Sequence, residues 1–253
     1  IAAALERAAA RGVTVKVMVD GFGSRRFLMR LLPRLHEQGV QVLIYRREVR
    51  KLSLHRHRLR RLHRKVVVID GREAFVGGIN IIDDFTAGGP PHPRYDFAVH
   101  VRGPVLAPIV SSMNRLWRLV AWASFRRRQQ LPLLAPAQAE PVGEICAAYV
   151  VRDNLRFRHA IEDAYLAAID GAQREIVIAS AYFFPGRRFR QALIDAAERG
   201  VSITLLLQGI ADHPLQRYAT RALYPYFLRQ GIRLFEYHRS HLHAKVAVVD
   251  GKW

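Results

Sequence analysis

One ten-residue stretch occurs twice in this chain, as LHRKVVVIDG at residues 62–71 and as LHAKVAVVDG at residues 242–251. Each copy carries a histidine, a lysine two residues later and an aspartate five residues after the lysine. An internal repeat decides the architecture before any single residue does. The two copies therefore predict a duplicated chain.

The similarity extends outward from both copies. Three matching segments precede each copy in the same order. The first is a helix-forming segment that ends at a glycine, and the other two are strand-like. The three are residues 5–13, 13–19 and 39–45 in the first half and residues 193–201, 201–207 and 231–237 in the second half. Alternating helices and β-branched runs predict an α/β fold with two similar helix-flanked sheet halves, an α/β sandwich, related by pseudo-twofold symmetry.

The division between the halves is predicted from composition. Apolar residues at helical spacing predict a helix within residues 104–128, and the proline-containing stretch 131–143 is typical of a linker. We therefore expect a first repeat at 1–130 and a second at 144–253. The chain begins inside a helix-like pattern and ends directly after a strand-like run, so we expect it to be part of a longer protein, with both repeats truncated.

Charge and cysteine content restrict the partners. The chain has 40 Lys plus Arg against 21 Asp plus Glu, a formal net charge of +19, which predicts an anionic partner. Nucleic acid and an anionic membrane surface both fit this excess. Cys146 is the only cysteine, which excludes an intramolecular disulfide and cysteine-based metal clusters and favours a reducing compartment. No apolar run reaches the roughly 18 to 20 residues of a transmembrane helix.

The repeated stretch places its histidine and lysine on one face. Side chains alternate along a strand, so His63 and Lys65 point the same way, as do His243 and Lys245. The aspartates at 70 and 250 lie an odd number of residues from the histidines and face away. We therefore expect Asp70 and Asp250 to support the strand end and not to touch substrate.

Two histidines and two lysines suit phosphodiester exchange. A neutral imidazole attacks phosphorus and forms a phosphohistidine, while a second, protonated imidazole donates a proton to the leaving alkoxide. The lysines are fixed charges for the nonbridging phosphate oxygens. This chemistry needs no metal and no cofactor, and the residues alone leave the roles of His63 and His243 interchangeable.

Two further segments after the first motif contribute candidate site residues. The turn at residues 77–80, Gly-Gly-Ile-Asn, would let the backbone at Gly78 approach a phosphate closely, and the Asn80 amide would donate a hydrogen bond to it. A nucleophilic imidazole needs an acceptor on its other nitrogen to set its orientation. Asp96 begins the next strand-like run, and we expect it to orient His63. A solvent-facing loop aspartate is the alternative.

These residues resemble the phospholipase D superfamily, which is marked by a duplicated H-x-K-x4-D motif followed by a Gly-Gly/Ser-x-Asn element. The runs LHRKVVVID at 62–70 and FVGGIN at 75–80, with AYFFP at 181–185, look like those of bacterial cardiolipin synthases. The resemblance implies that both motifs meet in one active site between the halves, with His63 as nucleophile, His243 as acid/base and the motif residues Lys65, Asp70, Lys245 and Asp250 in the catalytic set. It also implies transfer of a phosphatidyl group onto phosphatidylglycerol or another alcohol.

The chain departs from the family pattern in two places. The second Asn element and an orienting group for His243 are expected beyond residue 253, and the strand expected before the first alanine-rich helix is missing. We therefore expect activity to belong to the longer protein.

Two segments suggest how the protein meets its substrate. Eight basic residues crowd residues 46–61, just before the first motif, and would bind lipid headgroups or an anionic bilayer, although a solvated basic loop is the alternative. Trp117, Trp122 and Phe125, followed by three arginines at 126–128, mark either a membrane-facing helix or, more ordinarily, a helix packed on the sheet. We expect a peripheral protein on the cytoplasmic face of the bacterial inner membrane, with a phospholipid substrate and no obligate protein partner.

Other functions use the same residues. A phospholipase D-type hydrolase differs only in that water resolves the phosphohistidine. A superfamily nuclease would suit the charge, but nucleases of this kind often carry one motif per chain, so we do not expect nucleic acid to be the substrate. A lipid-binding module without activity is disfavoured by the intact motifs.

Overall fold

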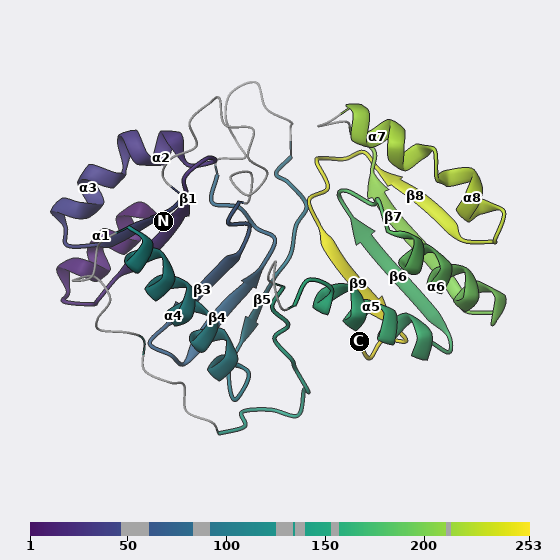
Figure 1. The fold of residues 1–253 in the computed structure, drawn as a ribbon, viewed down its shortest axis with the longest axis horizontal. Helices are drawn as coiled ribbons and strands as arrows, with labels where there is room; N and C mark the ends of the chain where they lie inside the picture. The colour runs from purple at the N-terminus through teal and green to yellow at the C-terminus, as the bar shows by residue number, and fades with distance from the viewer. Residues whose placement is uncertain (47–60, 83–91, 125–133, 135–139, 153–156, 211–213) are drawn as a thin grey trace. The chain divides into compact units, whose positions relative to one another are not determined.

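The computed structural model describes residues 1–46, 61–82, 92–124, 134, 140–152, 157–210 and 214–253 (Figure 1). The chain divides into two compact units, one made of residues 1–75 and 100–147 and the other of residues 76–99 and 148–253.

The first unit begins with alternating helices and strands. The elements are α1 (Ala2–Ala10), β1 (Lys16–Asp20), α2 (Arg25–Arg30), α3 (Leu32–Glu37) and β2 (Gln41–Tyr45). β1 and β2 pair in parallel, as expected of strands joined by a helical crossover, with Lys16 opposite Gln41 and Asp20 opposite Tyr45. The strands predicted at 13–19 and 39–45 are therefore present.

A three-stranded sheet follows, in the order β3-β4-β5. Its strands are β3 (Lys65–Ile69), β4 (Glu73–Gly77) and β5 (Ala98–Val101). β3 and β4 are joined by a tight turn in which Asp70 has φ +51° and Gly71 has φ +65°. The first motif thus continues into a strand, although His63 itself lies two residues before it.

Helix α4 (Leu106–Ala123) lies within the range predicted for it and packs on the parallel strands. Trp117 and Val120 are buried against Leu43 of β2. Trp122 is 62% exposed on the same helix, and Phe125 and residues 126–128 lie outside the described residues. The ordinary alternative, a helix packed on the sheet, is therefore confirmed for Trp117.

The second unit contains a four-stranded sheet with the order β8-β7-β6-β9. Its elements are α5 (Ala160–Gly171), β6 (Glu175–Ser180), α6 (Arg187–Glu198), β7 (Ser202–Gln208), α7 (Pro214–Arg221), α8 (Tyr224–Leu228), β8 (Arg233–Tyr237) and β9 (Lys245–Val249). β6, β7 and β8 are parallel, and β9 runs antiparallel to β6.

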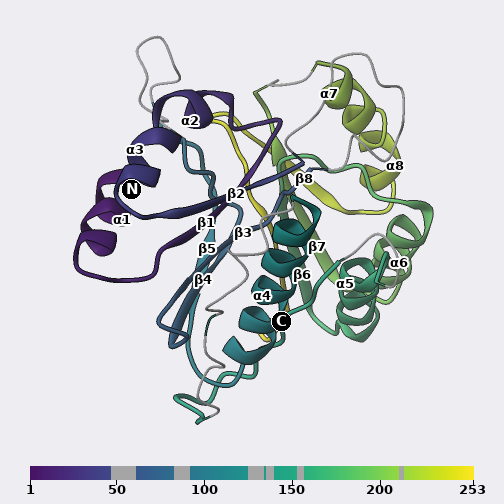
Figure 2. The same ribbon diagram turned by 60° about the vertical axis from the view of Figure 1, so that its left-hand side comes forward.

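Helices cover this sheet, as the alternating pattern predicts. Figure 2 shows α5 and α6 next to each other beside strands β6 and β7. The core includes Ile176 of β6, Leu193 of α6, Leu205 of β7 and Phe227 of α8, all at most 1% exposed. Two helix-flanked sheet halves are therefore confirmed.

The halves differ at one strand. β6 lies between β7 and β9 in the second unit. Among the described residues of the first unit, no strand lies between β1 and β3, which belong to separate sheets.

Residues 76–99 follow the first motif in sequence but group with the second unit. Tyr95 forms a parallel bridge with Leu242 and stacks on the Tyr237 ring, with centroids 5.4 Å apart. The backbone N–H of Tyr95 donates to His241 O at 2.9 Å, and that of His243 donates to Tyr95 O at 2.8 Å. This pairing brings part of the first repeat to the second motif.

No helix among the described residues is both long enough and apolar enough to span a bilayer.

Candidate active site

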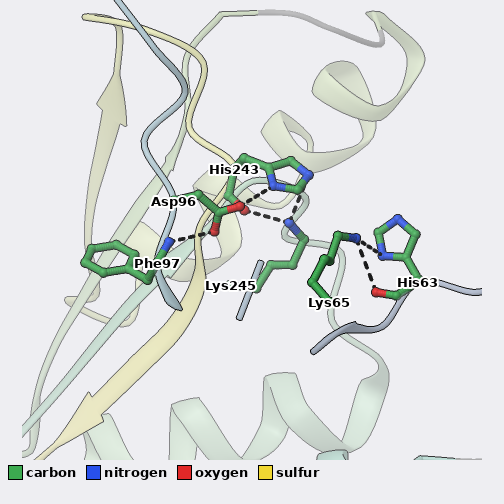
Figure 3. Close-up of polar contacts among 6 residues, drawn as sticks. All are labelled: His63, Lys65, Asp96, Phe97, His243 and Lys245. Atoms are coloured by element: carbon green, nitrogen blue, oxygen red, sulfur yellow. Dashed lines mark hydrogen bonds and ion pairs between the residues drawn. The ribbon is translucent and has the colours of Figure 1, made fainter. Parts of the chain in front are cut away.

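The second motif is held by a buried carboxylate. His243 is 9% exposed, and its Nδ1 lies 2.5 Å from Oδ2 of Asp96 (Figure 3). The Asp96 side chain is only 6% exposed, and its Oδ1 accepts the backbone N–H of Phe97 at 2.8 Å. Since an ionised carboxylate only accepts hydrogen bonds, His243 donates from Nδ1 and presents Nε2 for chemistry.

This contact corrects the partner that the sequence suggested. The sequence predicts that Asp96 orients His63 and that the group orienting His243 lies beyond residue 253. In the structure Asp96 orients His243, because the segment before β5 runs beside the segment before β9 through the bridge of Tyr95 with Leu242. Sequence order suggested the nearer histidine, and only backbone pairing brings the distant one to Asp96.

The glycines after the first motif make room for that carboxylate. A Cβ added at Gly78 would lie 2.3 Å from Asp96 Oδ1, and one at Gly77 would lie 2.3 Å from the Phe97 carbonyl oxygen. The sequence predicted that Gly78 lets the backbone approach a phosphate. The structure places Asp96 beside Gly78, where a larger residue would meet the carboxylate, and the approach of Gly78 to a phosphate stays a prediction. Asn80 is half-buried two residues later, and its phosphate contact stays a prediction.

Each histidine meets the lysine two residues after it (Figure 3). Lys245 Nζ lies 3.3 Å from His243 Nε2 and 2.6 Å from the His243 carbonyl oxygen. Lys65 Nζ lies 3.2 Å from His63 Nδ1 and 3.2 Å from the His63 carbonyl oxygen. Both contacts agree with the predicted common face. The two lysines approach different ring nitrogens, so the two imidazoles are held differently.

Asp250 supports the strand end, as alternation predicts. Its carboxylate accepts the backbone N–H groups of Gln173, Arg174 and Glu175 at 2.8, 2.8 and 2.9 Å. These bonds, that from Glu175 most of all, lower the pKa of Asp250 below its ordinary value. Asp250 therefore ties β9 to the start of β6, and its place in the catalytic set stays a prediction. Asp70 occupies the same place after β3, with the same positive φ.

The basic segment before the first motif lies mostly outside the described residues, from 47 to 60. Of its ends, the Arg61 guanidinium lies 3.9 Å from the Phe22 ring centroid, and that of Arg46 lies 5.6 Å from the Tyr45 ring centroid. No group of three or more His, Cys, Asp or Glu side chains in the described part of the chain is arranged to hold a metal ion.

A family model described as cardiolipin synthase, PLD-like domain, matches residues 1–88 and 165–253. Cardiolipin synthase B of Salmonella typhi is 41% identical over 251 residues, which are 99% of this chain and 60% of the relative. Cardiolipin synthase B of Escherichia coli K12 is 40% identical over the same shares. The chain thus spans about 60% of the length of these curated relatives.

Solved structures share the fold. Phosphatidylserine synthase of Haemophilus influenzae Rd KW20 matches with a TM-score of 0.61 and 14% identity, over 97% of this chain and 66% of that one. Polyphosphate kinase of Porphyromonas gingivalis matches with a TM-score of 0.51 and 18% identity, over all of this chain and 36% of that one.

Proposed function

Because the chain belongs to the cardiolipin synthase family with a phospholipase D-like domain, we propose that its protein is a phosphatidyltransferase. It transfers a phosphatidyl group, through a phosphohistidine, onto phosphatidylglycerol or another alcohol. The observation that carries the proposal is the buried Asp96–His243 pair with Lys245 at the opposite ring nitrogen. An imidazole held in this way is prepared for nucleophilic or acid–base work.

The first half-reaction cleaves a phosphodiester. One imidazole nitrogen bonds to phosphorus, the bond from phosphorus to the leaving alkoxide oxygen breaks, and the second imidazolium gives its proton to that alkoxide. The family resemblance assigns attack to His63 and proton donation to His243. The proposal requires both rings to act on one phosphorus atom.

The second half-reaction frees the nucleophilic histidine from the phosphatidyl group. The imidazole that lost its proton removes one from the acceptor hydroxyl, the hydroxyl oxygen bonds to phosphorus, and the phosphorus–nitrogen bond breaks. Asp96 stabilises the imidazolium that forms when His243 takes up the proton, because its carboxylate lies against Nδ1. His243 can therefore serve as acid and as base in turn.

The lysines supply fixed positive charge. Lys65 and Lys245 each lie beside their motif histidine, where a phosphate oxygen would be when phosphorus is in reach of the ring. The negative charge on the nonbridging oxygens must be stabilised while phosphorus changes geometry. We assign this task to the lysines and propose that Asn80 donates a further hydrogen bond.

The charge of the chain supports a membrane location. A net charge of +19 favours binding to anionic lipid surfaces, where phospholipid substrates reside. We propose peripheral attachment at the cytoplasmic face of the bacterial inner membrane. Basic residues of the 46–61 segment are the candidates for headgroup contact.

The decisive experiment incubates the full-length protein with labelled phosphatidylglycerol in vesicles and identifies the products. Formation of cardiolipin and free glycerol supports transfer. Phosphatidic acid without cardiolipin would instead assign the protein as a hydrolase. Cleavage of DNA with no lipid turnover would overturn both assignments.

A further inference from the structure

The residue before each motif histidine is held by a side chain from another strand. The backbone N–H of Leu62 donates to Asp20 Oδ1 at 3.0 Å, and the backbone N–H of Leu242 donates to Gln208 Oε1 at 2.9 Å. Asp20 is the last residue of β1, and Gln208 is the last residue of β7. The same contact thus occurs once in each unit, at equivalent places in the repeat.

The surroundings of the two acceptors repeat as well. The backbone N–H of the following glycine donates to the last residue of the neighbouring strand, from Gly21 to Tyr45 O at 2.9 Å and from Gly209 to Tyr237 O at 3.0 Å. A Cβ at Gly21 would lie 2.5 Å from Arg46 O. A Cβ at Gly209 would lie 2.5 Å from the His238 ring. Both strand ends are therefore fixed against their neighbours, which sets the direction of the acceptor side chain.

A side-chain acceptor is needed at this point of the chain. β3 and β9 begin only at Lys65 and Lys245, so the N–H groups of Leu62 and Leu242 precede their strands. Leu242 is 1% exposed, and a buried N–H without an acceptor is costly. The acceptor thus determines the path of the backbone one residue before the histidine.

The two halves provide this acceptor with different side chains, an amide in one and a carboxylate in the other. Gln208 also places its Nε2 3.4 Å from His241 Nδ1, whereas Asp20 uses its second oxygen to accept the Gly23 N–H at 3.1 Å. In the second unit the next N–H, that of His243, donates to Tyr95 O. Two successive N–H groups are therefore fixed, one by Gln208 and one by the segment that carries Asp96.

We propose that Asp20 and Gln208 are positioning residues for the two motif histidines. Each holds the backbone that aims its imidazole, and neither is required to touch the substrate. The inference rests on the proposed function for its catalytic readout, but the placement of the His243 ring can be measured without turnover.

The test compares variants of Gln208 in the full-length protein. Gln208→Leu keeps the side-chain size but removes the acceptor, and Gln208→Glu restores an oxygen at the same reach. Arg199→Met is the matched control, because Arg199 also donates a side-chain hydrogen bond to backbone in the second unit, to Ile169 O at 2.9 Å. If Gln208→Leu does not fold, Gln208→Asn replaces it in the test, because its shorter side chain moves the acceptor oxygen away from the Leu242 N–H by one methylene.

The first measurement is lipid turnover. Gln208→Leu is expected to lower kcat about 10- to 100-fold with KM for phosphatidylglycerol changed less than about threefold, since misplacement of a reacting group acts mainly on the chemical step. Gln208→Glu should recover most of the rate. In the first unit, Asp20→Leu should slow phosphohistidine formation. Asp20→Asn, which keeps an acceptor oxygen, should recover most of that rate.

The second measurement is the proton NMR resonance of the His243 Nδ1–H, which hydrogen bonding to Asp96 moves far downfield. Gln208→Leu should weaken or lose it, and Arg199→Met should keep it. The positioning role is wrong if Gln208→Leu retains both the resonance and the rate, or if Arg199→Met loses as much kcat. If the wild type turns over no lipid and the resonance still depends on Gln208, the positioning role stands and the proposed function falls.

Discussion

Asp96 and His243 are separated by 147 positions in sequence, yet a hydrogen bond of 2.5 Å joins them. The pair crosses the repeat boundary, because Asp96 follows the first motif and His243 belongs to the second. A segment of the first half thus completes the second motif. The following predictions test this pair and its surroundings in the full-length protein.

Asp96→Asn is expected to lower kcat for phosphatidyl transfer roughly 10²- to 10⁴-fold, because the amide cannot balance the imidazolium charge and permits the wrong ring tautomer. Steady-state assay with vesicle-borne phosphatidylglycerol measures this. The control is Glu73→Gln, which alters an exposed carboxylate–imidazole contact of 3.1 Å with His100. Equal losses in both variants would show that Asp96 has no special role.

Substitutions of the two motif histidines are expected to block different steps of the reaction. His63→Asn should abolish both turnover and covalent labelling, because the proposed nucleophile is gone. His243→Asn should slow the second half-reaction and trap labelled protein, since no base activates the acceptor hydroxyl. Labelling with radioactive phosphatidylglycerol followed by acid quench distinguishes them. Exchange of the two phenotypes would reverse the assigned roles, and near-normal turnover in either variant would end the two-histidine mechanism.

Gly78→Ala is expected to inactivate the protein without unfolding it. The new Cβ would lie 2.3 Å from Asp96 Oδ1 and would push the carboxylate from His243. Combination with Asp96→Asn should add little further loss, because both changes break the same contact. Gly143→Ala is the control, since a Cβ there meets nothing within 4 Å. Full additivity of the Gly78 and Asp96 changes would place the effect of Gly78 elsewhere.

Asp250→Asn is expected to destabilise the second unit. An amide cannot accept all three N–H groups that the carboxylate binds, those of Gln173, Arg174 and Glu175. These bonds lower the folded-state pKa of Asp250, so its stabilisation is full above the unfolded-state pKa and is lost as pH falls through the folded-state pKa. Melting temperatures across pH should therefore differ most at neutral pH and converge in acid. A difference that grows in acid would contradict this account.

Local rules accounted for much of the fold. The strands at β1, β2, β7 and β8 were predicted from β-branched runs after glycine, and the common face of each histidine and lysine from alternation. The support role of Asp250 also followed from its odd spacing. The roles of Asp20 and Gln208 were missed, although both end a strand directly before a glycine at matching repeat positions, which was the available signal.

The partner of His243 was predicted wrongly for a physical reason. Strand alternation acts over neighbouring residues, but the bridge of Tyr95 with Leu242 is a long-range pairing with no trace in local pattern. For the same reason local pattern does not indicate that Gly78 lies against the Asp96 carboxylate, which comes from a different segment. The sequence alone determined the duplication and the motif pairs and predicted phosphodiester chemistry for them, because these depend on residue identity and spacing. Only the tertiary structure decided which histidine receives Asp96, because that depends on which segments pair in space.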